Sequence, residues 1–156
     1  MKREFIIQGF PICVALIFFV LTSGCVSITP KKSYSGDKLP KSEVAVMKGR
    51  YYYALLYFDV VEIYKIDGKC MRSTKVEVLP GWHELVILNY VINLFGLPPD
   101  CVRAAFNFEA GHKYRIKTPL VFQRGDLVTI IDVNTGVTIF SGAWGGCAPE
   151  TWEGCE

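Results

Sequence analysis

The amino-acid sequence predicts an all-β protein, an antiparallel β-sandwich of about seven strands that follows an N-terminal signal peptide and a flexible tether. From Val44 onward, short runs of β-branched and aromatic residues alternate with polar residues and end at turn signals. This part of the chain lacks the i, i+3, i+4, i+7 apolar spacing of an amphipathic helix. With 156 residues, 51% of them hydrophobic and 13% aromatic, the chain can build one core but not two large domains.

The first 24 residues are typical of a signal peptide. Lys2 and Arg3 precede an uncharged apolar run from Phe10 to Leu21. That run has 12 residues, fewer than the roughly 20 that a membrane-spanning helix needs. Counted from Phe5 the apolar region has 17 residues, so an uncleaved membrane anchor is the alternative.

The end of this segment carries a lipidation motif. Residues Leu21–Cys25, Leu-Thr-Ser-Gly-Cys, resemble the lipobox of bacterial lipoproteins, whose cysteine is diacylated at sulfur and becomes the new N-terminus. The resemblance implies that Cys25 is lipidated and that acyl chains hold the protein to a membrane of the cell envelope. Val26 is not the Asp that retains such lipoproteins in the inner membrane, so the resemblance favours the periplasmic face of the outer membrane.

A polar segment separates this anchor from the domain. Ser, Pro, Gly and Lys predominate between Val26 and Glu43, which predicts a flexible tether. Its four lysines could touch anionic headgroups, but a solvated spacer is the simpler interpretation. The chain therefore divides into a lipoprotein signal peptide (1–24), a lipidated N-terminus and tether (25–43), a β-sandwich domain (44–141) and a Trp/Cys-rich C-terminal loop (142–156).

Alternation and turn residues place the strands of the domain. The predicted strands are 60–66, one that begins near 69 and includes 75–78, then 82–90, 102–108, 113–117, 127–133 and 137–140. Residues 51–58 are apolar or aromatic throughout, which fits either a buried strand or a short helix. Sequential strands at this spacing close into a sandwich or a small barrel.

Turn chemistry suggests how these strands are joined. Asp67-Gly68 is the dipeptide of a tight hairpin, and Asn134-Thr135-Gly136 joins the last two strands. Pro80-Gly81 implies a further hairpin between the strands on either side of it. In the strand 102–108, alternation places Phe106 and Phe108 on the inward face.

Two stretches are similar to a known family. Residues 76–87, Val-Glu-Val-Leu-Pro-Gly-Trp-His-Glu-Leu-Val-Ile, resemble the strand, Pro-Gly turn and X-His-X-hydrophobic-X-hydrophobic pattern of PEGA-type β domains on bacterial envelope proteins. Residues 106–116 are similar to the later strand, Ala-Gly turn and strand of that architecture. The resemblance spans about residues 60–118. It implies a small envelope β-sandwich used for display or contact, with no family catalytic residues to carry over.

Residues that carry chemistry are few. His83 and His112 are the two histidines, and alternation puts each on an inward face near a turn, where a hydrogen bond to the turn backbone is the expected role. Zinc would need further ligands at CxxC or HxxxH spacing, which the sequence lacks, so we expect no metal and no cofactor. Glu77 and Glu84 face outward by alternation, as a solvated acidic pair would.

The same search predicts that the protein is not an enzyme. The sequence contains no Gly-X-Ser-X-Gly elbow and no glycine-rich phosphate loop that leads a helix. The formal net charge of +2 is too small to hold a nucleic acid by charge alone, so we expect no nucleic-acid partner.

The C-terminal loop is the most unusual stretch. Trp144 and Trp152 stand in a glycine-rich segment that also contains Cys147 and Cys155. Exposed tryptophans of this kind are candidate binding residues for a glycan or a protein. In the alternative interpretation Trp144 caps the core and Trp152 packs within its own loop.

Cysteine parity predicts two disulfides. With Cys25 lipidated and Cys13 removed with the signal peptide, four cysteines remain in an oxidising compartment, namely Cys70, Cys101, Cys147 and Cys155. The predicted strand directions bring the first two together and leave the last two to pair within the tail. The competing connectivity ties Cys70 or Cys101 to the C-terminal loop and fastens the tail to the domain.

These observations favour a noncatalytic, membrane-anchored cell-envelope lipoprotein that displays a β-sandwich for structural or partner contact. Its expected partners are the membrane, through the lipid anchor, and an envelope protein or glycan. The alternative is an extracytoplasmic binding or inhibitor module that acts on glycan or protein through the C-terminal Trp loop.

Overall fold

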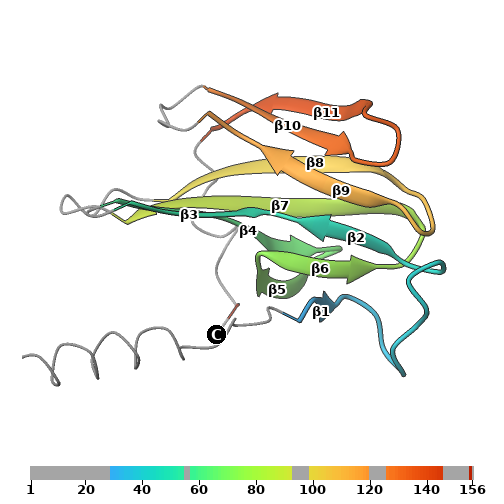
Figure 1. The fold of residues 1–156 in the computed structure, drawn as a ribbon. Helices are drawn as coiled ribbons and strands as arrows, with labels where there is room; N and C mark the ends of the chain where they lie inside the picture. The colour runs from blue at the N-terminus through green and yellow to red at the C-terminus, as the bar shows by residue number, and fades with distance from the viewer. Residues whose placement is uncertain (1–28, 55–56, 93–98, 120–125, 146–154, 156) are drawn as a thin grey trace, which may run out of the picture.

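The computed structural model describes residues 29–54, 57–92, 99–119, 126–145 and 155, and this part of the chain is all β (Figure 1). It contains eleven strands in two sheets, so the all-β class is confirmed and the expected number of about seven strands is too low. No helix among these residues is long and apolar enough to cross a membrane. The strands are β1 (Lys31–Lys32), β2 (Ala45–Lys48), β3 (Arg50–Ala54), β4 (Tyr57–Ile66), β5 (Lys69–Ser73), β6 (Lys75–Val78), β7 (Gly81–Ile92), β8 (Asp100–Phe108), β9 (Lys113–Lys117), β10 (Leu127–Asp132) and β11 (Thr138–Ala143).

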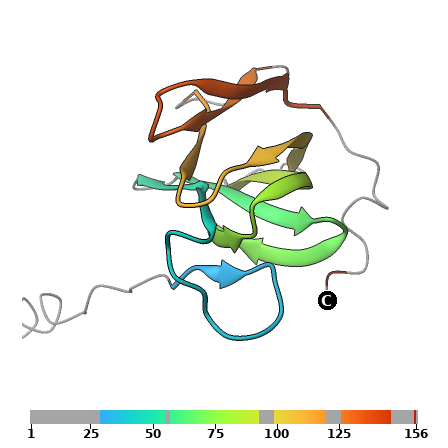
Figure 2. The same cartoon turned by 90° about the vertical axis from the view of Figure 1, so that its right-hand side faces the viewer.

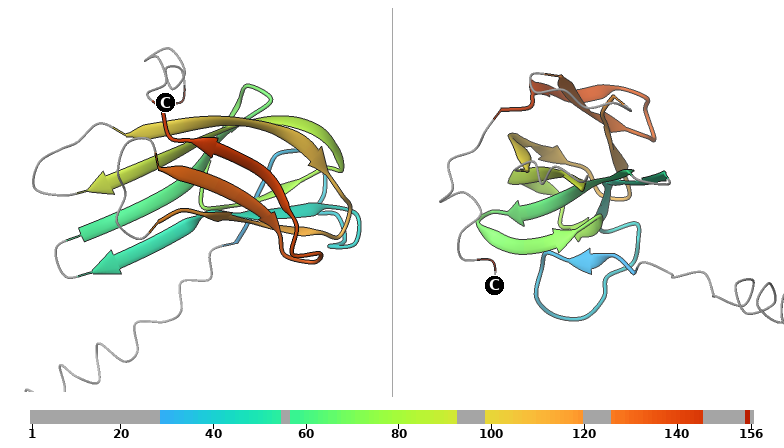
Figure 3. Two further views of the ribbon diagram at one scale, coloured as in Figure 1. Left: turned by 90° about the horizontal axis from the view of Figure 1, so that it is seen from above. Right: turned by 90° about the vertical axis from the view of Figure 1, so that its left-hand side faces the viewer.

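Two sheets share these strands. Sheet A has the order β1-β6-β2-β9-β10-β11, with β1 and β11 at its opposite ends (Figure 2). Sheet B has the order β3-β4-β7-β8, and β5 pairs with β4 beyond the end of β3. The pairs β1–β6 and β2–β9 are parallel, so the described strands are not purely antiparallel as the sequence predicted. Strands of both sheets run broadly along the long axis of the domain (Figure 3).

Two bent segments pass directly from one sheet to the other. Strand β2 continues through Gly49 into β3, and β5 continues through Thr74 into β6. The Gly49 N–H donates a hydrogen bond of 2.8 Å to the carbonyl oxygen of Thr74 where the two bends meet. A Cβ atom on Gly49 would lie 2.0 Å from the carbonyl oxygen of Val61, so only glycine fits this crossing without a backbone shift.

Turn geometry confirms two predicted hairpins and corrects a third. Asp67 and Gly68 both have positive φ, 49° and 76°, as a type I′ turn requires, and they join β4 to β5. The turn at 134–136 joins β10 to β11 in the same antiparallel manner. The Pro80-Gly81 turn does not form the predicted hairpin, because β6 lies in sheet A and β7 lies in sheet B. This turn instead carries the chain across the core.

The core lies between the two sheets and is built from inward positions of both. Phe106 and Phe108 are buried there as predicted, whereas Asn107 between them is exposed. The ring centroids of the two phenylalanines are 4.4 Å apart, and Tyr114 from sheet A meets Phe108 edge-on at 5.0 Å. Apolar burial of this kind contributes about 25 cal/mol per Å², which makes this cluster the main source of stability.

The structure also settles the two segments before the first predicted strand. Residues 51–54 belong to β3 and residues 57–58 to β4, so the described part of this stretch is strand and not helix. Part of the expected tether is ordered, because β1 (Lys31–Lys32) pairs in parallel with β6 and the Tyr34 hydroxyl lies 3.4 Å from Glu77 Oε2. Composition marks the segment as polar, but it cannot reveal that the free edge of β6 accepts a partner.

Candidate functional site

His83 closes a turn of sheet B. Its Nδ1 lies 2.5 Å from the Asp67 carboxylate and its Nε2 lies 3.0 Å from the carbonyl oxygen of Leu79, so the expected contact with a turn backbone is confirmed. Burial raises the pKa of Asp67, but the hydrogen bonds from His83 and from the Glu84 N–H outweigh this effect and hold the pKa below its usual value. The arrangement links the β4–β5 turn to the start of β7.

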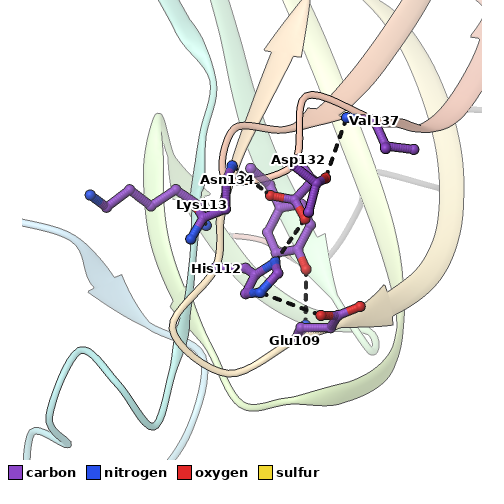
Figure 4. A network of polar contacts seen from close by, with 8 residues as sticks. Glu109, His112, Lys113, Asp132, Asn134 and Val137 are labelled. Carbon is purple, nitrogen blue, oxygen red and sulfur yellow. Dashed lines mark hydrogen bonds and ion pairs between the residues drawn. The ribbon is translucent and has the colours of Figure 1, made fainter.

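His112 also holds turns in place, but in the described residues its ring contacts two carboxylates and not the turn backbone that the sequence predicted (Figure 4). Its Nδ1 lies 2.7 Å from Asp132 Oδ2, and its Nε2 lies 3.4 Å from Glu109 Oε2. Asp132 also accepts a hydrogen bond of 2.8 Å from the backbone N–H of Asn134. Burial raises the pKa of Asp132, but these hydrogen bonds prevail and the pKa is lowered. The network fixes the β8–β9 and β10–β11 turns against each other.

The two imidazoles do not share a site. The rings of Phe108 and Tyr114 stand between them, since His83 packs against Phe108 at 5.8 Å and His112 packs against Tyr114 at 6.4 Å. Within the described ranges, no group of three or more His, Cys, Asp or Glu residues is arranged to hold a metal ion. Each histidine therefore acts on a turn.

The disulfide connectivity differs from the predicted pairing. Cys70 is bonded to Cys155, which excludes the expected Cys70–Cys101 and Cys147–Cys155 bonds and agrees with the competing connectivity that fastens the tail to the domain. Cys70 lies in β5 and Cys101 in β8, with β4 and β7 between them. Three strand spacings of about 4.8 Å place them about 14 Å apart, twice the longest Cα separation of a disulfide.

Cys155 is the one described residue after Gly145, and it lies against the outer face of sheet B. Cys155 packs there in a second apolar cluster with Tyr64, Leu88 and Cys101, and Arg72 donates a hydrogen bond to the Cys155 carbonyl oxygen. Cys101 is also disulfide-bonded, with a partner outside the described residues. An antiparallel bridge between Cys101 and Gly145, which follows β11, joins the edges of the two sheets.

The predicted tryptophan site is only partly visible. Trp144 is 2% exposed and belongs to the main core, so it caps the core and is not accessible to a partner. This burial corrects its assignment as a candidate binding residue. Trp152 and Cys147 lie outside the described residues, as does Cys25, the predicted lipidation site.

One end of the core is polar. Arg50 and Asp59 form an ion pair across β3 and β4, and Arg50 donates further hydrogen bonds to the carbonyl oxygens of Thr118 (2.9 Å) and Pro119 (3.0 Å). Burial raises the pKa of Asp59, and Arg50 opposes the rise only in part. Asn89 is also buried, and neither polar atom of its side chain has a hydrogen-bond partner among the described residues.

Cationic side chains gather on the outer face of sheet A. Lys48 in β2 lies directly opposite Lys75 in β6 on one side and Arg115 in β9 on the other. Three like charges therefore form one row across three neighbouring strands. Lys113 extends from the adjacent row of β9, and its side chain points away from the His112 network (Figure 4).

This row lies in a groove of about 500 Å³, which we call the sheet A groove. Six cationic residues line it, namely Lys38, Lys41, Lys48, Lys75, Lys113 and Arg115. The one acidic residue of the lining is Glu77, so the local formal charge is +5, against +2 for the whole chain.

Glu77 offsets only one of the six positive charges of the groove. It is 1% exposed because β1 and Tyr34 cover it, so the expectation of a solvated Glu77 is wrong, whereas Glu84 is exposed as expected. Lys38 Nζ lies 3.8 Å from its carboxylate. In the described part of the chain, no ion pair engages the other five cations of the groove.

Sequence reasoning found one edge of this groove and missed the rest. The strict alternation of 113–117 already turns its basic side chains outward. The parallel pairing of β2 with β9, which brings Lys48 beside Arg115, has no local sequence signal. Comparison with protein-family models, with curated proteins and with solved structures found no match for this chain. The groove is therefore interpreted from the chemistry of its own residues.

Proposed function

We propose that the protein is a noncatalytic cell-envelope lipoprotein, lipid-anchored through Cys25, that displays a β-sandwich for structural or partner contact on the periplasmic face of the outer membrane. The observation that carries the proposal is the spacing between the lipobox-like cysteine and the fold. Cys25 precedes Thr29, the first described residue, by four residues, and β1 begins two residues later. Four extended residues span at most about 14 Å, so a lipidated Cys25 would hold the domain close to the bilayer.

Two further features support a display role. The histidines and their carboxylate partners hold turns of the fold in place. The PEGA-type resemblance of residues 76–87 and 106–116 implies an envelope domain used for contact. The alternative function is a C-terminal Trp loop that binds glycan or protein. Trp144 is buried in the core, so this function would depend on Trp152.

The proposal is tested by replacing the anchor cysteine. Cys25→Ala should abolish labelling of the protein by radioactive palmitate and change its membrane distribution, because the thiol that receives the diacylglycerol is gone. Cys13→Ala is the matched control, since it removes a cysteine from the apolar run and keeps the lipobox-like residues. Unchanged labelling of Cys25→Ala would refute lipidation at this site. Absence of labelling in the unmutated protein, with retention in the membrane, would favour the uncleaved anchor.

A further inference from the structure

We propose that the sheet A groove binds the phosphate groups of anionic phospholipid headgroups in the leaflet that carries the protein's own anchor. The inference rests on the proposed membrane attachment and adds a second point of contact to it. An acyl chain alone fixes the distance of a domain from the bilayer but not its orientation. A cationic face that meets the headgroups would fix which side of the domain faces the membrane.

The charge pattern of the groove favours an anionic ligand. Like charges directly opposite each other on neighbouring strands are destabilising, yet Lys75, Lys48 and Arg115 occupy three such positions in succession. Strand β2 lies in the interior of sheet A, so these lysines do not serve to protect a sheet edge from aggregation. The side chains of Lys48 and Arg115 are exposed, and an approaching anion can therefore reach them.

The start of the fold favours a membrane as the source of that anion. Thr29 and Pro30 line the same groove as the cations. Because Cys25 is four residues earlier in the chain, the groove mouth would lie within about 14 Å of the anchor.

A second depression extends the contact along the same face. It has a volume of about 460 Å³, shares Lys48 and Arg115 with the first groove, and adds the cation of Lys117. Arg50 also lines it, but its charge is already paired with Asp59. Tyr51, which is 61% exposed, also lines it. Tyrosine is favoured at the headgroup level of a bilayer because its ring is apolar and its hydroxyl is polar. Each Lys or Arg held at an anionic leaflet strengthens the contact by about fivefold.

Lysine footprinting on vesicles tests the proposal with the full chain. The protein is reconstituted through its own N-terminal anchor into vesicles of phosphatidylcholine, or of phosphatidylcholine with 30% phosphatidylglycerol, and acetylated briefly. We expect Lys48, Lys75 and Lys113 to react at least about threefold more slowly in the anionic vesicles, and this protection to vanish in 0.5 M NaCl because salt screens the contact. Lys65, in β4 of sheet B, is the internal control and should keep its reactivity.

Two double variants that lose the same charge distinguish binding at the sheet A groove from general electrostatic attraction to the vesicle surface. Lys48→Gln with Lys75→Gln should remove most of the protection of Lys113, whereas Lys65→Gln with Lys69→Gln, an equal loss of charge, should leave it unchanged. Equal reactivity of the groove lysines in both kinds of vesicle, or equal protection of Lys65, would overturn the proposal. Protection by dissolved glycerol phosphate or alginate, without protection by phosphatidylglycerol, would overturn it in favour of a soluble anion.

The same samples keep the two proposals apart. The mass of the N-terminal peptide reports whether Cys25 carries acyl chains, independently of the footprint. An unprocessed apolar segment would attach the chain to the same vesicles, so failed lipidation does not itself abolish lysine protection. A lipidated protein with no protection at Lys48 and Lys75 would leave the anchor intact and refute the groove.

Discussion

Removal of the Cys70–Cys155 disulfide should cost a large part of the stability of the domain. The bond joins residues that are 85 positions apart in sequence. In the chain-entropy model, a closed loop of that length restricts the unfolded chain by about 4.6 kcal/mol at 25 °C. The variant tested is Cys70→Ser with Cys155→Ser, which leaves no unpaired thiol from this bond.

A second disulfide lowers the expected loss of stability, because it shortens the loop that Cys70–Cys155 closes. Cys101 is also bonded, and we predict Cys147 as its partner because it is the remaining cysteine of the lipidated, processed chain. With that bond intact, the shortest covalent loop closed by Cys70–Cys155 has about 40 residues, and the expected loss falls to about 3.9 kcal/mol. Since small domains unfold at 5–15 kcal/mol, the variant should approach the limit of folding at 37 °C.

Urea unfolding followed by tryptophan fluorescence measures the effect, with the m-value as a check that the same surface is exposed on unfolding. Nonreducing peptide mapping of the unmutated protein should yield a peptide that links Cys70 to Cys155. A loss of less than about 1 kcal/mol with an unchanged m-value would refute the loop-closure reasoning. A peptide linking Cys70 to Cys101 would contradict the connectivity itself.

Three further changes test the core, the turns and the polar end of the fold. Phe106→Ala should lower the free energy of unfolding by about 3 to 5 kcal/mol, because the ring is buried. Asn107→Ala, on the exposed side of the same strand, should change it little. Equal shifts in melting temperature for the two variants would show that the register of β8 is wrong. Asp132→Asn should cost about 2 kcal/mol at pH 7. Because its pKa is lowered in the fold, this contribution is present in full above the unfolded value of 3.8 and is lost as pH falls through the lower pKa of the folded state, so the stabilities of the two proteins should converge as the pH is taken below 3.8. Asn89→Leu should stabilise by about 1 kcal/mol, since it removes a buried amide with no partner among the described residues; a loss of stability would reveal a polar partner.

Local sequence signals predicted most of the strands, because the signal for a strand depends on only a few neighbouring residues. Alternation placed Phe106 and Phe108 inward, and Asp67-Gly68 gave the correct hairpin because both positions need positive φ. The number of strands was underestimated for two reasons. The bend at Thr74 divides one predicted strand into β5 and β6, and the segments that form β1, β2 and β3 lie before the first predicted strand.

Pairing between strands could not be predicted from the same signals. A Pro-Gly turn has the same sequence whether it closes a hairpin or connects strands of two sheets. At Pro80-Gly81 it connects β6 of sheet A to β7 of sheet B. That difference misdirected the disulfide prediction, since β4 and β7 intervene between the strands of Cys70 and Cys101. Burial of Glu77 was missed for a related reason, because alternation identifies its face but not the strand that covers it.

The position of the Lys75–Lys48–Arg115 row within the fold connects stability to the proposed membrane contact. Opposite charges at these cross-strand positions would add a few tenths of a kcal/mol per pair, and uncharged threonines would be neutral, whereas like charges oppose folding by a similar amount. The chain carries two such repulsive pairs on central strands of a domain that its disulfides already stabilise. An anionic surface would reverse the sign of this repulsion, because each phosphate placed between two cations converts a destabilising pair into a bridged one. The domain would then be most stable in the orientation in which sheet A faces the membrane.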